Sequence, residues 1–329
     1  MYFRSMIMAA IVLSVIGALP ARAADLPAKA PPVTMVPDNP FFSVNDNRLS
    51  YAYLAQGTDP GVPGKTAKQV YNFSHFDVWA YGTNLFSISL NKSDHNDPAR
   101  GGTGGATEFY GVLRSTFGFN QIFDTRMFTI GPLQNVSFVV GGDVETENNN
   151  VGPAKRLGVV GLQFAFNLPY KGYINVSPLL YKEINHNVFL GCGTITTGAP
   201  CIPDANTNFR ESWALELNYY MDLGFLPEYL PLSVSGRAGI YGPKGNQNSP
   251  LNTGFESKTE ILAEPIRLTL DASRMMWGAK YSHFADLWVA YRYWQNKYGL
   301  DHVNNPTCLG RNIGTCTEST VYSGVTVKF

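Results

Sequence analysis

The sequence lacks long apolar runs, an excess of either charge, and a large number of cysteines. Beyond residue 19 no stretch of about 18 consecutive apolar residues occurs, which excludes a protein that spans a membrane with helices. Lysine plus arginine equals aspartate plus glutamate at 25 each, and this balance argues against nucleic-acid binding and against a purely electrostatic anion pore. Charged residues make up only 15% of the chain, whereas soluble enzymes of this length usually carry more.

The four cysteines form two close pairs, Cys192 with Cys201 and Cys308 with Cys316. Each pair lies in a stretch rich in glycine, proline, threonine or asparagine, which predicts two local disulfides in loops. An exported protein meets an oxidising compartment where such pairs close, and nearest-neighbour pairing is one of three connectivities. Zinc is the rival interpretation, but neither pair has the two-residue spacing or the nearby histidines of a zinc site.

The amino terminus predicts export. Arg4 precedes an apolar run over residues 6–19, which is too short to span a bilayer, and Ala21-Arg22-Ala23 matches the small-x-small cleavage pattern. We therefore expect a signal peptide over residues 1–23. Residues 24–46 contain several prolines and predict an extended periplasmic tail.

The remaining residues, 47–329, alternate apolar with polar positions between turn signals. Such alternation predicts strands with one apolar and one polar face. Aromatic residues reach 13%, as expected where half of each strand faces lipid and aromatic girdles mark the interfaces. We predict an all-β fold: a transmembrane antiparallel β-barrel in a bacterial outer membrane, with a secreted β-sandwich as the alternative.

Twelve strands are expected, and an even number places both termini in the periplasm. Their approximate ranges are 47–56, 68–81, 85–91, 107–116, 134–145, 156–167, 172–184, 210–221, 232–241, 262–278, 285–297 and 319–329. The connections alternate between short turns, such as 82–84 and 168–171, and long polar segments, such as 57–65, 92–105 and 299–318. Short turns are expected at the periplasmic end and long loops, with both cysteine pairs, at the outer end. Two periplasmic links, 117–132 and 222–231, are longer than this rule predicts.

The last strand places Val321, Val325 and Val327 on one face, with Thr320 and Tyr322 on the other. It ends in Phe329, and a terminal aromatic resembles the signal that barrel-assembly machinery reads in outer-membrane proteins. Outer-membrane lipid is therefore the expected partner of the apolar face, and the polar face is expected to line a lumen.

A twelve-stranded barrel has an intermediate bore that suits a narrow, one-solute path. Aromatic faces and ionisable groups of both signs would suit a neutral polar solute, although inward charges also pair simply to neutralise a lumen. The aromatic candidates for the lumen are Tyr110, Tyr181, Tyr241, Trp288 and Trp294. The ionisable candidates are Glu108, Arg114, Asp143, Glu183, Glu216, Arg237 and Arg292.

Three segments carry a family resemblance. Residues 129–133 lead into a strand that ends Gly141-Gly142-Asp143, residues 289–296 read Val-Ala-Tyr-Arg-Tyr-Trp-Gln-Asn, and residues 107–111 are similar in type. With these segments the chain resembles the Tsx-like nucleoside-specific channel-forming outer-membrane proteins, over most of its mature length. The resemblance implies a twelve-stranded barrel that passes nucleosides. The proline-rich tail and the two cysteine-closed loops depart from that family and leave the solute open.

Three other motifs give only weak evidence for a catalytic, calcium-binding or phosphate-binding site. Ser74, His75 and Asp77 have nucleophile and base types, but adjacent strand residues point to opposite faces, so Ser74 and His75 cannot meet directly. The segment 94–97 contains two aspartates that could hold Ca²⁺, yet without a recognisable ligand spacing it predicts a solvated loop. The glycine-rich segment 101–105 lacks the Lys-Ser/Thr of a phosphate loop.

The leading hypothesis is a passive outer-membrane channel for small polar solutes such as nucleosides, which needs no enzyme activity, cofactor or metal. The alternative is a non-conducting barrel whose disulfide-closed loops serve as a receptor or adhesion element. A lipid-active barrel enzyme is the third hypothesis, and it would lose activity when one Ser or His is changed.

Overall fold

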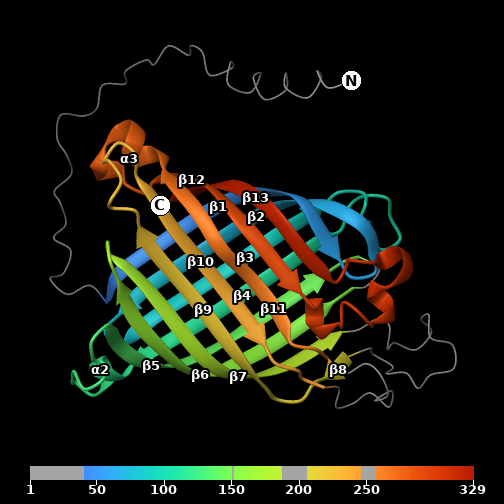
Figure 1. Cartoon of the computed structure of the whole chain (residues 1–329), viewed down its shortest axis with the longest axis horizontal. Helices are drawn as coiled ribbons and strands as arrows, with labels where there is room; N and C mark the ends of the chain where they lie inside the picture. Colours follow the sequence, from blue (N-terminus) through green and yellow to red (C-terminus); the bar gives the residue numbers. More distant parts are fainter. Residues whose placement is uncertain (1–40, 150–151, 187–205, 246–256) are drawn as a thin grey trace, which may run out of the picture. The chain divides into compact units, whose positions relative to one another are not determined.

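We describe the fold from a computed structural model, which covers residues 41–149, 152–186, 206–245 and 257–329 (Figure 1). Antiparallel strands make up nearly all of it. Their bounds are β1 Phe42–Asp59, β2 Val62–Trp79, β3 Gly82–Ser93, β4 Thr107–Gly118, β5 Leu133–Glu147, β6 Ala154–Leu168, β7 Gly172–His186, β8 Asn206–Asn208, β9 Ser212–Asp222, β10 Leu232–Tyr241, β11 Glu260–Asp271, β12 Ala285–Gln295 and β13 Thr317–Lys328.

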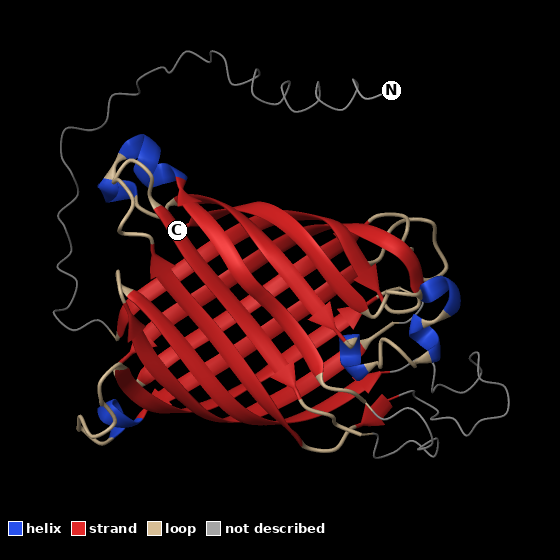
Figure 2. Cartoon of the chain, in the orientation of Figure 1, coloured by secondary structure: helices blue, strands red, loops and turns tan. Residues whose placement is uncertain are grey.

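Twelve of these strands form a closed barrel. Each pairs antiparallel with its neighbours in the chain, β1 pairs with β13, and β6 pairs with β7, so the sheet closes without an open edge. The three-residue strand β8 pairs only with the end of β7, and β9 takes its place in the wall. Figure 2 shows the strands tilted across the wall, with helices only at the two ends. The predicted twelve-stranded antiparallel barrel is confirmed.

The alternation of residue types sets which side chains face outward. Leu180 and Val321 are 63% and 61% exposed on the outer wall, whereas Tyr181 and Tyr322, one residue further along each strand, are 3% and 8% exposed. The inner wall contains two apolar clusters. One joins Val139, Leu157, Val159, Leu179, Tyr181, Ala214 and Tyr241, and the other joins Ala52, Leu54, Trp288, Ala290 and Tyr322.

The two ends of the barrel differ. At one end, called the turn end, lie the start of β1, the close of β13 and the turns β2–β3, β4–β5, β6–β7, β9–β10 and β11–β12. At the other, called the loop end, lie the β1–β2 hairpin and the connections β3–β4, β5–β6, β7–β9, β10–β11 and β12–β13. Figure 1 shows α3 and the C-terminus at the turn end and β8 at the loop end.

The predicted short turn at 82–84 is wrong, because β3 already begins at Gly82. The largest differences from the sequence prediction lie at three other places. Residues 57–65 were expected to form a loop, but β1 and β2 continue to a tight turn at Gly61, whose φ is 80°, and bulges around Gly57 absorb the irregular residues. Barrel strand β1 starts at Phe42, so five residues assigned to the tail belong to the wall. The expected strand 262–278 ends at Asp271.

A short helix, α3 (Ala272–Trp277), replaces the end of that expected strand. Asp271 accepts a hydrogen bond from the Arg274 amide at 2.8 Å and so caps the helix. The other described helices are α2 (Phe119–Ile122), in the long β4–β5 link, and single 3₁₀ turns: η2 Ala279–Tyr281, η3 Lys297–Gly299, η4 Pro306–Cys308 and η5 Gly310–Asn312. Within the described ranges, no helix has the length and apolar character needed to cross a membrane.

Cys308 and Cys316 form a disulfide within the β12–β13 connection, as the spacing predicts, with their Cα atoms 5.6 Å apart. Cys192 and Cys201 lie outside the described residues.

Candidate functional site: the barrel lumen

One arginine connects strands of the inner wall that are not neighbours. Arg114 on β4 donates from Nε to Glu216 Oε2 at 2.9 Å, and its Nη2 lies 2.5 Å from Glu216 Oε1. Its Nη1 lies 2.6 Å from Asp143 Oδ1 on β5. Because β5, β6 and β7 separate β4 from β9 along the wall, the Arg114–Glu216 pair crosses the lumen. A bidentate arginine–carboxylate pair holds this crossing in one geometry.

Tyrosines surround this bridge. Tyr241 donates to Glu216 Oε1 at 2.9 Å, and Tyr110 donates to Asp143 Oδ2 at 3.3 Å. Tyr181 packs edge-on against Tyr241, with ring centroids 5.4 Å apart, and donates to the Gly242 carbonyl at 2.6 Å. The centre of the lumen therefore combines aromatic rings with an anchored pair of carboxylates.

The wall formed by β11, β12 and β13 carries a second aromatic and charged cluster. The Arg267 guanidinium lies 3.9 Å from the centre of the Trp288 ring, and Trp288 donates to Thr326 at 3.0 Å. Arg267 also pairs with Glu264 at 2.7 Å, and Tyr322 donates to the same carboxylate. Arg237 lies opposite Glu264 in the β10–β11 ladder. Arg267 and Glu264 are not among the residues predicted from the sequence. They are three residues apart, and a bulge in β11 lets them pair with each other.

Towards the loop end, the β12–β13 connection enters the lumen. Lys297 is 2% exposed and donates to Glu318 Oε2 at 2.8 Å, and Arg292 lies 2.7 Å from the other Glu318 oxygen. Tyr298 donates to Glu145 on β5, which lies across the barrel from β12. Burial, and then the Glu145 charge, raise the pKa of Tyr298 well above its usual value, so the hydroxyl stays protonated and donates. The connection thus narrows this end of the lumen.

Buried charge pairs line the rest of the loop end. Lys244 Nζ lies 2.6 Å from Glu183 Oε2, with side chains that are 2% and 1% exposed. Trp294 donates to Glu260 at 2.7 Å. Lys68 on β2 lies 2.7 Å from Asp59, 3.2 Å from Glu108 and 3.7 Å from Glu147.

The structure thus gives contacts to each of the twelve predicted lumen residues. Arg114, Asp143, Glu216, Tyr110, Tyr181 and Tyr241 meet in the central cluster, and Trp288 belongs to the β11–β13 wall. Arg237, on β10, lies beside that wall, opposite Glu264 in the β10–β11 ladder. Glu108, Glu183, Arg292 and Trp294 lie among the buried pairs of the loop end. Lys68, Lys244 and Lys297 were missed, because a lone lysine in an alternating segment gives no sign of its partners.

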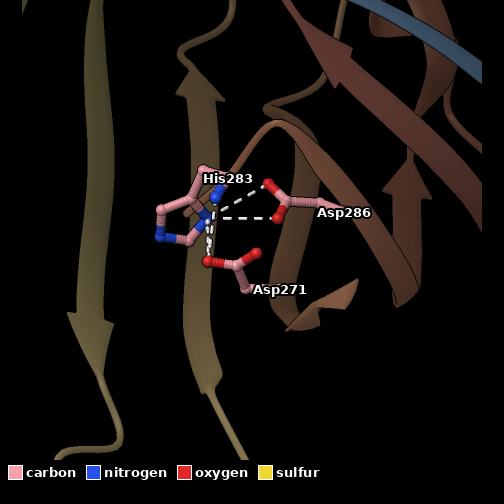
Figure 3. Close-up of side chains that lie close together, drawn as sticks. All are labelled: Asp271, His283 and Asp286. Carbon is pink, nitrogen blue, oxygen red and sulfur yellow. Dashed lines mark hydrogen bonds and ion pairs between the residues drawn. The ribbon is translucent and has the colours of Figure 1, made fainter. Parts of the chain in front are cut away.

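At the turn end, Asp271, His283 and Asp286 lie close enough for their ligand atoms to approach within 4.8 Å (Figure 3). Both Asp271 oxygens already accept hydrogen bonds: Oδ1 from Ser273 and Arg274, and Oδ2 from Ser282 and the His283 amide. His283 Nδ1 lies 3.1 Å from Asp286, and that hydrogen bond raises the pKa of the imidazole. The cluster organises the α3–η2 turn through hydrogen bonds.

A second candidate cluster for a metal lies at the loop end and comprises Asp59, Asp97 and Glu147. The segment 94–97, which sequence reasoning treated as solvated, places Asp97 inside this cluster with 0% exposure. Burial, and then the Asp59 carboxylate, raise the pKa of Asp97.

The comparisons with known proteins give no family. No protein-family model and no curated protein matches the chain. The chain is similar to solved outer-membrane barrels. The β-domain of the Bordetella autotransporter Brka is 8% identical at a TM-score of 0.37, with 87% of this chain and 99% of that one covered. The translocator domain of autotransporter NalP from Neisseria meningitidis is 13% identical at 0.37, with 87% of each chain covered. OccK11 (OpdR) from Pseudomonas aeruginosa is 8% identical at 0.35, with 87% of this chain and 95% of that one covered. The Tsx-like resemblance is confirmed by none of these comparisons and stays a prediction.

Proposed function

We propose that this protein is a bacterial outer-membrane channel through which small polar solutes diffuse passively. The membrane location rests on the outer wall. Leu49, Leu180, Trp213, Leu287 and Val321 are all 49–63% exposed there, on five different strands. A continuous apolar band of this kind around a closed barrel is stable in lipid, where every backbone polar group must be paired within the protein.

The observation that carries the channel proposal is the Arg114–Glu216 crossing, surrounded by tyrosine rings. A charge cluster that crosses the lumen divides it into narrow passages. Such a constriction excludes large solutes. The mixed charges along the wall give further sites that bind a polar solute weakly enough to release it.

Nucleosides are the solute class that this constriction suits best. Tyr181 and Tyr241 pack edge-on beside the crossing, and a flat base that displaces this packing would meet their rings. The carboxylates of Glu216 and Asp143 already accept hydrogen bonds from tyrosine hydroxyls, and ribose hydroxyls would compete for the same oxygens. Passage in this proposal needs neither a cofactor nor a chemical step.

One observation favours the alternative, a non-conducting barrel that binds partners through its loops. Lys297 is buried in the loop end of the lumen, and Tyr298 reaches Glu145 on the facing wall. If this segment stays in place, the lumen is closed and the loops are the functional surface.

Single-channel recording separates the two functions. We would refold the mature barrel into a planar bilayer and titrate adenosine, with a sugar of similar size as the control. The channel proposal expects small, steady current steps that adenosine blocks and the sugar does not. Equal block by both solutes would leave a general channel without nucleoside preference, and absence of current would reject the channel in favour of the loop-binding barrel.

A further inference from the structure

Three connections meet at one buried point of the loop end. Asp59 is the last residue of β1, Asp97 lies in the β3–β4 connection, and Glu147 is the last residue of β5. Their exposures are 6%, 0% and 6%, and one carboxylate oxygen of each lies within 4.8 Å of those of the other two.

The negative charge at this point exceeds the positive charge. Glu108 adds a fourth carboxylate, since it shares Lys68 with Asp59 and Glu147. Among the residues that the structure describes, Lys68 is the only cation that these carboxylates contact, and Arg292, which acts on Glu108 from further away, pairs with Glu318. Buried carboxylates without a counter-charge are strongly destabilising.

Two oxygens of the cluster have no hydrogen-bond donor. Asp59 Oδ1 accepts from Lys68, whereas Asp59 Oδ2 is buried without a hydrogen-bond partner. Glu147 Oε2 accepts from Asn149 at 2.8 Å, whereas Glu147 Oε1 is buried, lacks a hydrogen bond and lies 3.7 Å from the Lys68 ammonium. Buried polar atoms normally have a partner, so two such oxygens beside a third carboxylate indicate an additional ligand.

The remaining contacts hold the carboxylates in place. Asp97 accepts from Ser93 at 2.9 Å and from Asn149 at 3.2 Å. The Asn149 side chain thereby joins the β3–β4 connection to the end of β5, and the Arg100 amide donates to the Asn148 carbonyl beside it. An arrangement fixed by surrounding hydrogen bonds is typical of a metal site with an ordered outer shell.

We propose that Asp59, Asp97 and Glu147 bind a calcium ion that fastens the three connections together at the loop end of the barrel. Carboxylates are the ligands that hard divalent cations prefer, and oxygens that each lie about 2.4 Å from one ion can be at most about 4.8 Å apart. Calcium accepts irregular sets of oxygens, whereas magnesium demands an octahedron and keeps several waters.

A pocket adjoins the cluster at Asp97. Asp97 lines a pocket of about 430 Å³ at the loop end, together with residues of the β1–β2 turn and of the segment 95–98. The ion would add two positive charges to four carboxylates and one ammonium. Binding would therefore stabilise the folded loops, which predicts greater resistance to unfolding in calcium.

Calorimetric titration of the EGTA-treated, folded barrel with CaCl₂ tests the proposal. One calcium ion should bind per barrel, and Glu147→Gln should weaken binding by about tenfold or more. The matched control is Glu211→Gln, which removes an exposed loop carboxylate outside the cluster and should leave calcium affinity unchanged. Titration with MgCl₂ should give much weaker binding.

A thermal measurement guards against a folding defect in the variant. Without calcium, Glu147→Gln should unfold at the same temperature as the wild type or above it, because a repulsive buried charge is gone. Added CaCl₂ should raise the unfolding temperature of the wild type but not of this variant. The proposal is overturned if the wild type takes up no calcium, if Glu147→Gln binds it as tightly, or if MgCl₂ binds equally well.

Discussion

The lumen is built differently at its two ends. At the loop end, charged side chains are paired and buried: Lys297 and Glu318 are both 3% exposed, and Lys244 and Glu183 are 2% and 1% exposed. At the turn end, Arg48 and Lys328 share Asp46 while 40% and 39% of their own side chains remain exposed. The comparison shows that the charged side chains at the loop end are shielded from solvent, whereas those at the turn end stay in contact with it.

The difference follows from what fills each end. The β12–β13 connection inserts Lys297 and Tyr298 among the strands, and each inserted charge needs a counter-charge on the wall. At the turn end the inward residues meet solvent, and they form solvated ion pairs at Asp46 and neutral contacts such as Ser50 with Thr326 at 2.8 Å. Stability should therefore depend on ion pairs at the loop end and hardly at all at the turn end.

The largest expected effect comes from breaking a buried pair at the loop end. Lys68→Met leaves Asp59, Glu108 and Glu147 without the ammonium that they share, so the free energy of unfolding should fall by about 3 kcal/mol or more. Arg48→Met at the turn end should cost less than about 1 kcal/mol, since its ion pair is solvated. The free energies of unfolding of both variants can be measured by urea unfolding in lipid vesicles with EGTA, followed by tryptophan fluorescence. Equal losses of stability in the two variants would contradict the difference between the two ends.

The disulfide should have the next largest effect. Cys308 and Cys316 close a short loop in the β12–β13 connection and are almost fully buried. Replacing both with serine should lower the free energy of unfolding by about 2 kcal/mol, mainly by freeing the unfolded loop. The same urea experiment measures this loss, with the reduced wild type as the control. If neither the serine variant nor the reduced wild type loses stability, the packing of the loop is sufficient without the disulfide.

The smallest effect is a pH dependence at the turn end. The hydrogen bond to Asp286 raises the pKa of His283 above the value of the unfolded chain. The stabilisation that His283 contributes should therefore be complete below about pH 6.5 and be lost as the pH rises through the higher folded pKa. Its size should stay below about 1 kcal/mol, because the imidazole is partly exposed.

Unfolding of the wild type and of His283→Gln across this pH range measures that dependence. The difference between the two proteins should shrink as the pH rises. A difference that grows with pH would mean that the neutral imidazole is the stabilising form.

Alternation along the chain was sufficient to predict the barrel, because each strand has to place apolar side chains outside and polar ones inside. It worked for β10 and β7, whose starts were predicted to the residue. It failed at residues 57–65, where glycines and prolines indicate a loop but bulges keep the hairpin paired. It also failed at α3, because the capping by Asp271 depends on contacts with Ser282 and His283, which follow later in the chain.

The lumen was less predictable than the wall. Alternation places Arg114 and Glu216 on the inner face, but 102 residues separate them, and their meeting depends on how strand register closes around the barrel. The same holds for Lys68 and Glu147, which belong to strands three positions apart in the wall. The residue pattern along one strand does not show which side chain of another strand an inward residue will contact across the lumen.

The central claim is that the lumen is a diffusion path constricted at the Arg114–Glu216 crossing. The direct test is to measure single-channel conductance in planar bilayers for the wild type, Arg114→Ser and Arg48→Ser. Arg114→Ser should raise conductance by about twofold or more and shift the reversal potential toward cations, because Glu216 and Asp143 lose their counter-charge. Arg48→Ser, at the open turn end, should conduct like the wild type. If Arg114→Ser leaves both conductance and selectivity unchanged, or if the two variants change them equally, the constriction does not lie at this pair.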